Sequence, residues 1–273
     1  MKNKYHTQPD IGLAKSTHNP MKIPFKFGAP ILALALATTS ANAATYFIDA
    51  DNDLVPNGIG SGQSFQLVFV TSTSTTREDT PGSGTDNHSI THWNDYVNNV
   101  ADGSSLTTVP AITWYAAAST ISTAANVNAA VTHDVYRLDG VLVDTAASFW
   151  SDTGTNTDDG GIQNPINIDE SGNLNSGVET WGGGPKYTQD GSIGQALGNG
   201  TNENSQGVTI GRSDRSGDGF QRSWWSDADG GFRRTPDESA HFYAISETIT
   251  VVPEPSTALL GGLGMLLLLR RRR

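Results

Sequence analysis

Short runs of β-forming residues alternate with segments rich in Gly, Asn, Asp, Ser and Thr along residues 44–251. The clearest run, residues 65–70, is mostly apolar, which is typical of a strand buried on both faces. The last run should end before Pro253, because proline has no amide hydrogen to donate within a sheet. Further strands are expected at residues 112–116, 207–211 and 241–251. The pattern predicts an α+β, β-rich domain.

One helix is predicted between Ser89 and Gly103. Apolar residues recur there every three or four positions, which places them on one helical face. Ser89 is a favoured N-cap residue, and Gly103 is a favoured helix end. Trp93 belongs to the apolar face and should anchor the core. The pattern does not decide the secondary structure of residues 117–130.

A β-hairpin is predicted at residues 135–143. Asp139-Gly140 lies between two β-rich runs, and this dipeptide favours a two-residue type I′ turn because both central positions need positive φ. Residues 151–207 are mostly loop-like, with Trp181 and residues 193–197 as anchors. So long an irregular stretch is unusual in a compact domain, and indicates either a functional loop region or an unreliable local assignment.

Residues 21–43 have the features of a secretory signal peptide. Two lysines precede an apolar stretch, and Ala41-Asn42-Ala43 then supplies the small residues that signal peptidase requires. Cleavage is therefore predicted between Ala43 and Ala44. Residues 1–20 are polar and would form an unusually long extension ahead of the lysines, so we expect a misassigned start codon.

Residues 252–273 form a tail of three parts. Pro253-Glu254-Pro255 stiffens its start, because each proline fixes its own φ and restricts the residue before it. Residues 258–269 form an apolar run of 12 residues. A helix that crosses a bilayer needs ~20. We expect this short hydrophobic helix to enter a bilayer from one side, with the final arginines on the cytoplasmic face. These are Arg270, Arg271, Arg272 and Arg273.

The tail resembles the PEP-CTERM sorting signal of exosortase substrates in Gram-negative bacteria. Pro253-Glu254-Pro255 matches the motif of that family, and the apolar run and arginine cluster follow in the family's order. The resemblance implies export, with signal peptidase and an exosortase-type sorting enzyme as partners. It also implies transient inner-membrane anchoring by residues 258–269, and a final place at the cell surface or in the biofilm matrix, in contact with exopolysaccharide.

Composition narrows the range of partners. The chain has no cysteine, so an exported domain cannot rely on disulfides. Residues 44–252 hold 26 acidic and eight basic residues, which gives this segment a net charge of −18. A surface of this charge repels nucleic acid and anionic lipid, and favours solubility or divalent cations.

The order of elements over residues 62–250 resembles a C-type-lectin-like domain, in which the first and last strands pair and a long loop region carries ligands. A jelly-roll or other β-sandwich is the alternative, because the disulfides common in the lectin-like fold cannot form here. Trp93-Asn94-Asp95 matches the Trp-Asn-Asp signature of sugar-binding C-type lectins, but it lies in the predicted helix, so we interpret that match as coincidence. The resembling segments are Phe69-Val70-Thr71-Ser72-Thr73, Trp93-Asn94-Asp95-Tyr96, Ile112-Thr113-Trp114, Val135-Tyr136-Arg137-Leu138-Asp139-Gly140 and Phe242-Tyr243-Ala244-Ile245.

Four acidic residues near the C-terminal end of the domain suggest a calcium site. Clustered carboxylates are the ligands that calcium prefers, although the spacing departs from that of an EF-hand. The alternative is a set of ordinary solvated loop acids. The four residues are Asp214, Asp218, Asp227 and Asp229.

Trp224-Trp225 lies between these acids and is a candidate ligand contact. Side chains alternate along a strand, so adjacent tryptophans cannot both enter one face, and one is expected to be exposed. An exposed indole beside carboxylates suits a sugar, which can stack on the ring and hydrogen-bond to the acids. The alternative is that both tryptophans are buried.

No catalytic residue is predicted. The chain has neither a Gly-x-Ser-x-Gly elbow nor a His-Glu-x-x-His motif, while paired carboxylates for glycoside hydrolysis remain open. We therefore expect a non-enzymatic, exported surface or matrix protein that binds or embeds in exopolysaccharide. A secreted carbohydrate-active hydrolase and a purely structural surface protein are the alternatives.

Overall fold

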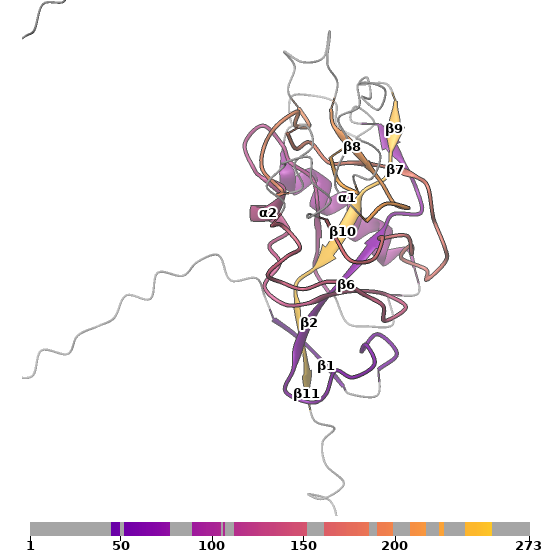
Figure 1. The fold of residues 1–273 in the computed structure, drawn as a ribbon. Coiled ribbons are helices and arrows are strands. Elements are labelled where there is room, and N and C mark those ends of the chain that lie inside the picture. Colours follow the sequence, from indigo (N-terminus) through magenta and orange to yellow (C-terminus); the bar gives the residue numbers. More distant parts are fainter. Residues whose placement is uncertain are drawn as a thin grey trace, which may run out of the picture. The chain divides into compact units, whose positions relative to one another are not determined.

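The computed structural model describes residues 45–49, 52–76, 89–104, 106, 112–151, 161–185, 190–198, 208–216, 224–226 and 238–252. All of them belong to one unit of contacts, residues 42–273. The elements in Figure 1 are β1 (Thr45–Asp49), β2 (Ser64–Val70), β3 (Thr75–Thr76), α1 (Ile90–Asp102), β4 (Trp114–Ala116), α2 (Ala125–Asn128), β5 (Val135–Arg137), β6 (Leu142–Asp144), β7 (Glu179–Trp181), β8 (Ile210–Arg212), β9 (Ser239–Ala240), β10 (Tyr243–Ser246) and β11 (Thr248–Val252).

The strand β2 is the centre of a seven-stranded sheet. On one side it pairs with β5, which runs parallel to it and continues into β6. On the other side it pairs antiparallel with β10 near Val70 and with β11 near Phe65. The far edge of β10 pairs with β4, and the far edge of β11 pairs in parallel with β1. The first described strand therefore lies beside the last.

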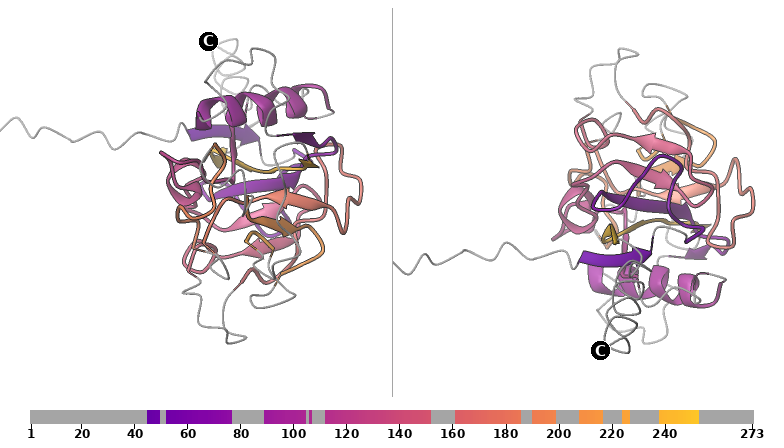
Figure 2. Two further views of the ribbon diagram at one scale, coloured as in Figure 1. Left: turned by 90° about the horizontal axis from the view of Figure 1, so that it is seen from above. Right: turned by 90° about the horizontal axis from the view of Figure 1, so that it is seen from below.

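The two faces of β2 enter two separate hydrophobic clusters. Phe65, Leu67 and Phe69 join the cluster that includes residues of α1, which covers this face of the sheet (Figure 2). Val68 and Val70 join the opposite cluster, which takes residues from β5, β6, β10, α2 and irregular segments. All five side chains are fully buried, so the two-sided burial predicted from the apolar run is confirmed.

Helix α1 begins and ends where the sequence predicts. The Ser89 hydroxyl oxygen accepts a hydrogen bond from the Thr91 amide at 3.3 Å, and Gly103 caps the other end. Trp93 is fully buried and stacks on Phe242, the residue just before β10, with 4.9 Å between ring centroids. Its predicted role as a core anchor is confirmed.

Asn94 holds the helix to the edge strand β4. Its side-chain oxygen accepts hydrogen bonds from the Ala116 amide at 2.9 Å and from the Asn128 side chain at 2.8 Å. Asn98 makes similar bonds to the amide and carbonyl of Trp114. The Trp-Asn pair of the lectin-like signature therefore serves helix packing, which agrees with the interpretation of that match as coincidence.

The predicted hairpin forms from β5 and β6, but its turn differs from the expected type. The Gly140 amide donates to the Arg137 carbonyl, and the Arg137 amide donates to the Val141 carbonyl, both at 2.9 Å. The loop therefore has three residues rather than two. This arrangement needs positive φ only at the last loop position, where Gly140 has a φ of 81°.

The strands β1, β3, β7 and β9 were not predicted. β1 follows the expected leader directly, and β7, which pairs antiparallel with β8, lies inside residues 151–207, which look like loop in the sequence. The expectation of a β-rich domain with few helices is confirmed for the described residues. Neither helix in this part of the chain has the length and apolar character that a membrane span requires.

Candidate functional site

The end of β11 joins the folded domain to the tail. Val251 pairs with Ile48 of β1, and Val252, the last residue of β11, pairs with Asp49. Val251 is fully buried, and it is held from both sides, by Ile48 of β1 and by the backbone of Gln63 just before β2. Because Pro253 follows at once, the tail starts directly at the end of an inner strand, with no linker between them.

A tight turn flanks this end of β11. The Gln63 amide donates to the Gly60 carbonyl at 3.0 Å, and Gly62 has a φ of 84°, as the third position of a type II turn requires. The turn is bonded to the strand, because the Gly62 amide donates to the Val251 carbonyl at 2.7 Å and the Val251 amide donates to the Gln63 carbonyl at 2.9 Å. We call residues 60–63 the exit turn.

The predicted sorting and cleavage residues lie outside the described residues. These are Pro253, Glu254, Pro255, Arg270, Arg271, Arg272 and Arg273 in the tail, and Ala41, Ala43 and Ala44 at the leader. The described residues begin at Thr45 in β1 and end at Val252 in β11, so they include the strand that adjoins each segment.

Trp224 and Trp225 are both fully buried, so the expectation that one of them is exposed is wrong. Trp224 packs against Phe149, Trp150 and Tyr243, with ring centroids 5.1 to 5.6 Å apart. The Trp225 indole nitrogen donates to the Ala117 carbonyl at 2.6 Å. The prediction assumed a strand with alternating sides, whereas the pair lies in an irregular segment of which both side chains enter the core. Neither indole offers a face to a sugar.

Glycines from distant segments make room for this pair. A Cβ on Gly182 would lie 2.0 Å from the Trp225 carbonyl oxygen, and one on Gly211 would lie 1.9 Å from the Trp224 carbonyl oxygen. A Cβ on Gly184 would meet the Trp225 ring at 2.2 Å. The glycine-rich stretch after β7 is therefore a packing surface for the tryptophans.

Of the four proposed calcium ligands, the structure describes only Asp214. Its carboxylate pairs with Arg212 at 3.1 Å and with Arg215 at 3.6 Å. Partial burial acts to raise the pKa of Asp214, but the hydrogen bonds from Arg212 and the charges of both arginines outweigh it and lower the pKa. Asp218, Asp227 and Asp229 lie outside the described residues. Within the described ranges, no group of three or more acidic or histidine side chains could hold a metal ion.

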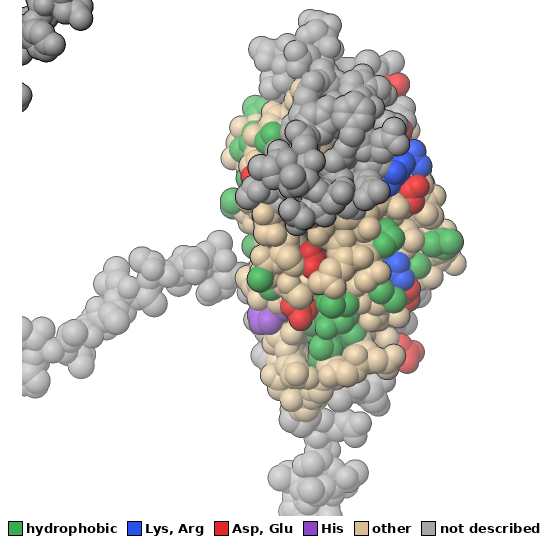
Figure 3. Space-filling model, viewed as in Figure 1, with side chains coloured by type: hydrophobic (Ala, Val, Ile, Leu, Met, Phe, Trp, Pro, Cys, Tyr) green, Lys and Arg blue, Asp and Glu red, His purple; other side chains and the backbone are tan. Residues whose placement is uncertain are grey.

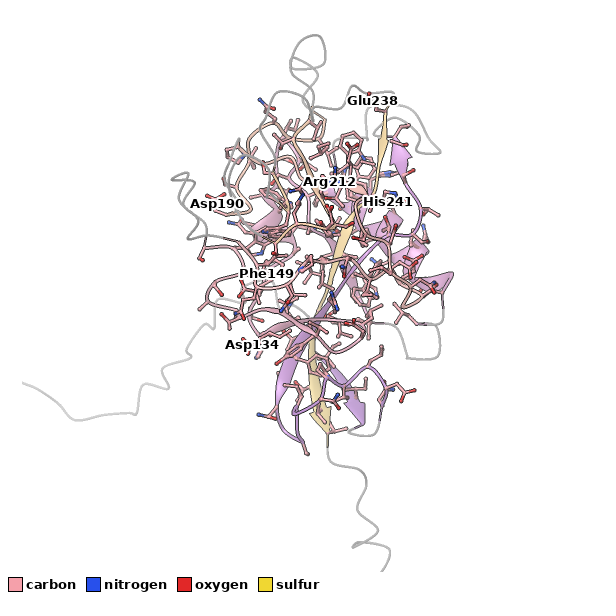
Figure 4. All side chains as sticks on the ribbon, turned by 45° about the vertical axis from the view of Figure 1, so that its right-hand side comes forward. Asp134, Phe149, Asp190, Arg212, Glu238 and His241 are labelled. Carbon is pink, nitrogen blue, oxygen red and sulfur yellow. The ribbon has the colours of Figure 1, made fainter. Side chains whose placement is uncertain are left out.

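A polar cluster at the far end of the sheet from β11 was missed by sequence reasoning. Glu170 is buried and accepts hydrogen bonds from the amide and the hydroxyl of Ser72. The Thr71 carbonyl accepts from the Asn175 side chain at 3.1 Å and contacts His241 Nδ1 at 2.6 Å. Figure 4 shows His241 near this end, remote from Asp134. Asp169-Glu170-Ser171-Gly172 looks like an ordinary turn in the sequence, so no signal could have marked Glu170.

The hydrogen bonds of this cluster have a structural role, because they join the residues that follow β2 to Glu170, Asn175 and His241. Burial lowers the pKa of His241, although the Thr71 carbonyl and the Glu170 carboxylate oppose the shift. Burial raises the pKa of Tyr96, because it disfavours the charged form of a tyrosine as it does that of a histidine. The Tyr96 hydroxyl donates to the Thr73 carbonyl at 2.9 Å. Ser72 is bonded to Glu170 and His241 to a backbone carbonyl, so these two side chains do not form a nucleophile and base pair.

Comparison with protein families gives information about the tail. No curated protein matches the chain. The family model described as the PEP-CTERM protein-sorting motif matches residues 251–273. This match begins at Val251, inside β11, so it overlaps the folded sheet by the last two residues of that strand. The chain therefore ends in a PEP-CTERM protein-sorting motif, the signal of an exported substrate of an exosortase-type sorting enzyme.

Proposed function

We propose that this protein is an exported component of the cell surface or extracellular matrix, which embeds in or binds exopolysaccharide after its tail is processed. The observation that carries the proposal is the sorting motif, which follows the inner strand β11 without a linker. In this proposal residues 258–269 anchor the chain transiently in the inner membrane, while the domain folds on the outer side of that membrane. Signal peptidase cleaves between Ala43 and Ala44, and the sorting enzyme acts on the tail.

The surface and charge of the domain support a matrix role. In the described part of the face seen in Figure 3, uncharged polar side chains and backbone cover most of the surface, and Lys and Arg side chains are few. Hydroxyl and amide groups of this kind can exchange hydrogen bonds with a polysaccharide, directly or through water. Since both tryptophans of the predicted contact are buried, binding through an exposed Trp224 or Trp225 is no part of the proposal.

A C-type-lectin-like fold is the more specific form of this proposal. The pairing of β2, the first strand within residues 62–250, with β10 and β11 supports it, as do the described irregular residues between β6 and β10. An experimental structure of the domain would test it. A sheet in which the first and last strands are not neighbours would exclude the lectin-like arrangement and would favour the β-sandwich alternative.

Cell fractionation tests the sorting function. Cells with an exosortase would express the full chain or a chain that stops at Val252. We expect the full chain to reach the surface in a shortened form, and the truncated chain to be released without retention. Equal retention of both chains would mean that the tail does not sort this protein.

Co-sedimentation tests the matrix function. The processed protein would be mixed with exopolysaccharide from the same cells, with and without a chelator. We expect the protein to sediment with the polymer. A protein that stays in the supernatant at every polymer concentration favours the structural alternative, and release of new reducing ends favours the hydrolase.

A further inference from the structure

The sorting motif has very little chain between the folded sheet and its apolar run. Val252 is the last residue of β11, and residues 253–257 are all that separate it from the apolar residues 258–269. Five residues span at most about 18 Å when fully extended. If residues 258–269 lie in the bilayer, as the proposed function requires, the end of β11 lies close to the membrane surface.

Residues of β11 cannot leave the sheet and lengthen the tail without a substantial loss of free energy. β11 lies between β1 and β2, and Val251 is fully buried with its amide and carbonyl both bonded to the exit turn. Lengthening the tail by unpairing β11 would expose this residue and break the pairing with two strands. An enzyme that holds residues 253–257 therefore meets the folded domain at the exit turn.

We infer that the exit turn, residues 60–63, is the surface on which the membrane-embedded sorting enzyme docks while it holds the tail. This inference rests on the proposed sorting function. All four residues of the turn are exposed, and Gly60, Ser61 and Gly62 have small side chains or none. The Gln63 side chain is turned back onto the Gly60 amide. An uncharged surface without protruding side chains lets another protein approach the backbone closely.

The charges near the turn favour a protein rather than lipid as the occupant. Lipid surfaces with anionic headgroups attract Lys and Arg. Residues 52–63 contain neither of these residues, and Asp53 adds a negative charge to a domain that is already acidic. The domain is thus repelled by an anionic bilayer, so a protein is favoured over lipid as the occupant of the exit turn.

A bulky side chain on the exit turn tests the inference. Ser61→Trp would be compared with the matched control Ser61→Ala, and with Val127→Trp on α2, where the native side chain is already 71% exposed. Each full-length chain would be expressed with the sorting enzyme, and loss of the tail would be followed by mass after a pulse of synthesis. We expect Ser61→Trp to slow processing several-fold at an unchanged melting temperature, while both controls keep the parental rate.

A linker variant separates docking from other effects of the bulky side chain. A flexible Gly-Ser linker of about ten residues between Val252 and Pro253 would lift the domain away from the enzyme. The linker chain should then be processed at the same rate with and without the Ser61→Trp substitution. A slow rate that persists despite the linker, or a parental rate for Ser61→Trp in the chain without the linker, would overturn the docking inference. If the parent chain itself keeps its tail, the sorting function fails, and the docking inference fails with it.

Discussion

Replacement of Trp93 by alanine should remove a large part of the stability of the domain. Its side chain is fully buried between α1 and the sheet, stacked on Phe242 and packed against the edge of His92, each with 4.9 Å between centroids. Deletion of a large buried aromatic side chain costs about 3–5 kcal/mol, because apolar contacts are lost and a cavity remains. Domains are stable by only about 5–15 kcal/mol, so the loss is a substantial fraction of the total.

The expected change in melting temperature follows from the size of the domain. In a domain of 150–250 residues, each kcal/mol shifts the melting temperature by roughly 2–4 °C, so Trp93→Ala should lower it by about 6–20 °C. Near-ultraviolet circular dichroism during heating would measure this. Trp93→Phe should cost less, since it keeps a stacked ring and removes an indole N–H that is buried without a hydrogen-bond partner.

Val127→Ala is the matched control, because its side chain is 71% exposed and should contribute less than about 0.5 kcal/mol. A melting temperature for Trp93→Ala within about 2 °C of the parent would refute the placement of Trp93 in the core. It would also reopen the lectin-like interpretation of Trp93-Asn94-Asp95.

Three further predictions concern packing, pH and calcium. Gly182→Ala should destabilise the domain by about 1–3 kcal/mol in urea unfolding, because its Cβ would collide with the Trp225 backbone; a parental midpoint would contradict the close approach. Burial lowers the pKa of His241 in the folded state, so the unfolded chain binds a proton first and stability falls as pH drops below about 6.5. His241→Gln should reduce this loss between pH 7.5 and 5, and an unchanged pH profile would contradict it. Calcium binding by the four acids stays a prediction: millimolar calcium should raise the melting temperature, and Asp227→Asn should remove most of the rise. An unaltered melting curve would rule the site out.

Elements with a strong local pattern could be predicted from the sequence. β2 has a run of apolar β-formers, and α1 has a periodic apolar face with a good residue at each end, so both were found with bounds close to the observed ones. The sorting motif was found for a similar reason, because a short linear signal is contained in its own residues.

Features that depend on distant segments could not be predicted. β7 has only three residues, too few to show the alternation of apolar and polar residues that is typical of a strand. It forms because β8 lies beside it in the fold. The burial of Trp224 and Trp225 depends on glycines that come close to them only in the fold, namely Gly182, Gly184 and Gly211. The hairpin turn was placed correctly but given one residue too few, because Asp139-Gly140 also suits a three-residue loop.

The mass of the intact protein at the cell surface tests the central claim most directly. The claim is that the folded domain is exported with a leader and a sorting tail, and that both are removed. Surface protein would be purified from cells that express the natural chain and analysed by intact-mass spectrometry with sequencing of both ends. We predict a chain that begins at Ala44, retains Val252 at the end of β11 and lacks Arg273. A chain that still carries Arg273, or that still carries residues 21–43, would contradict the account.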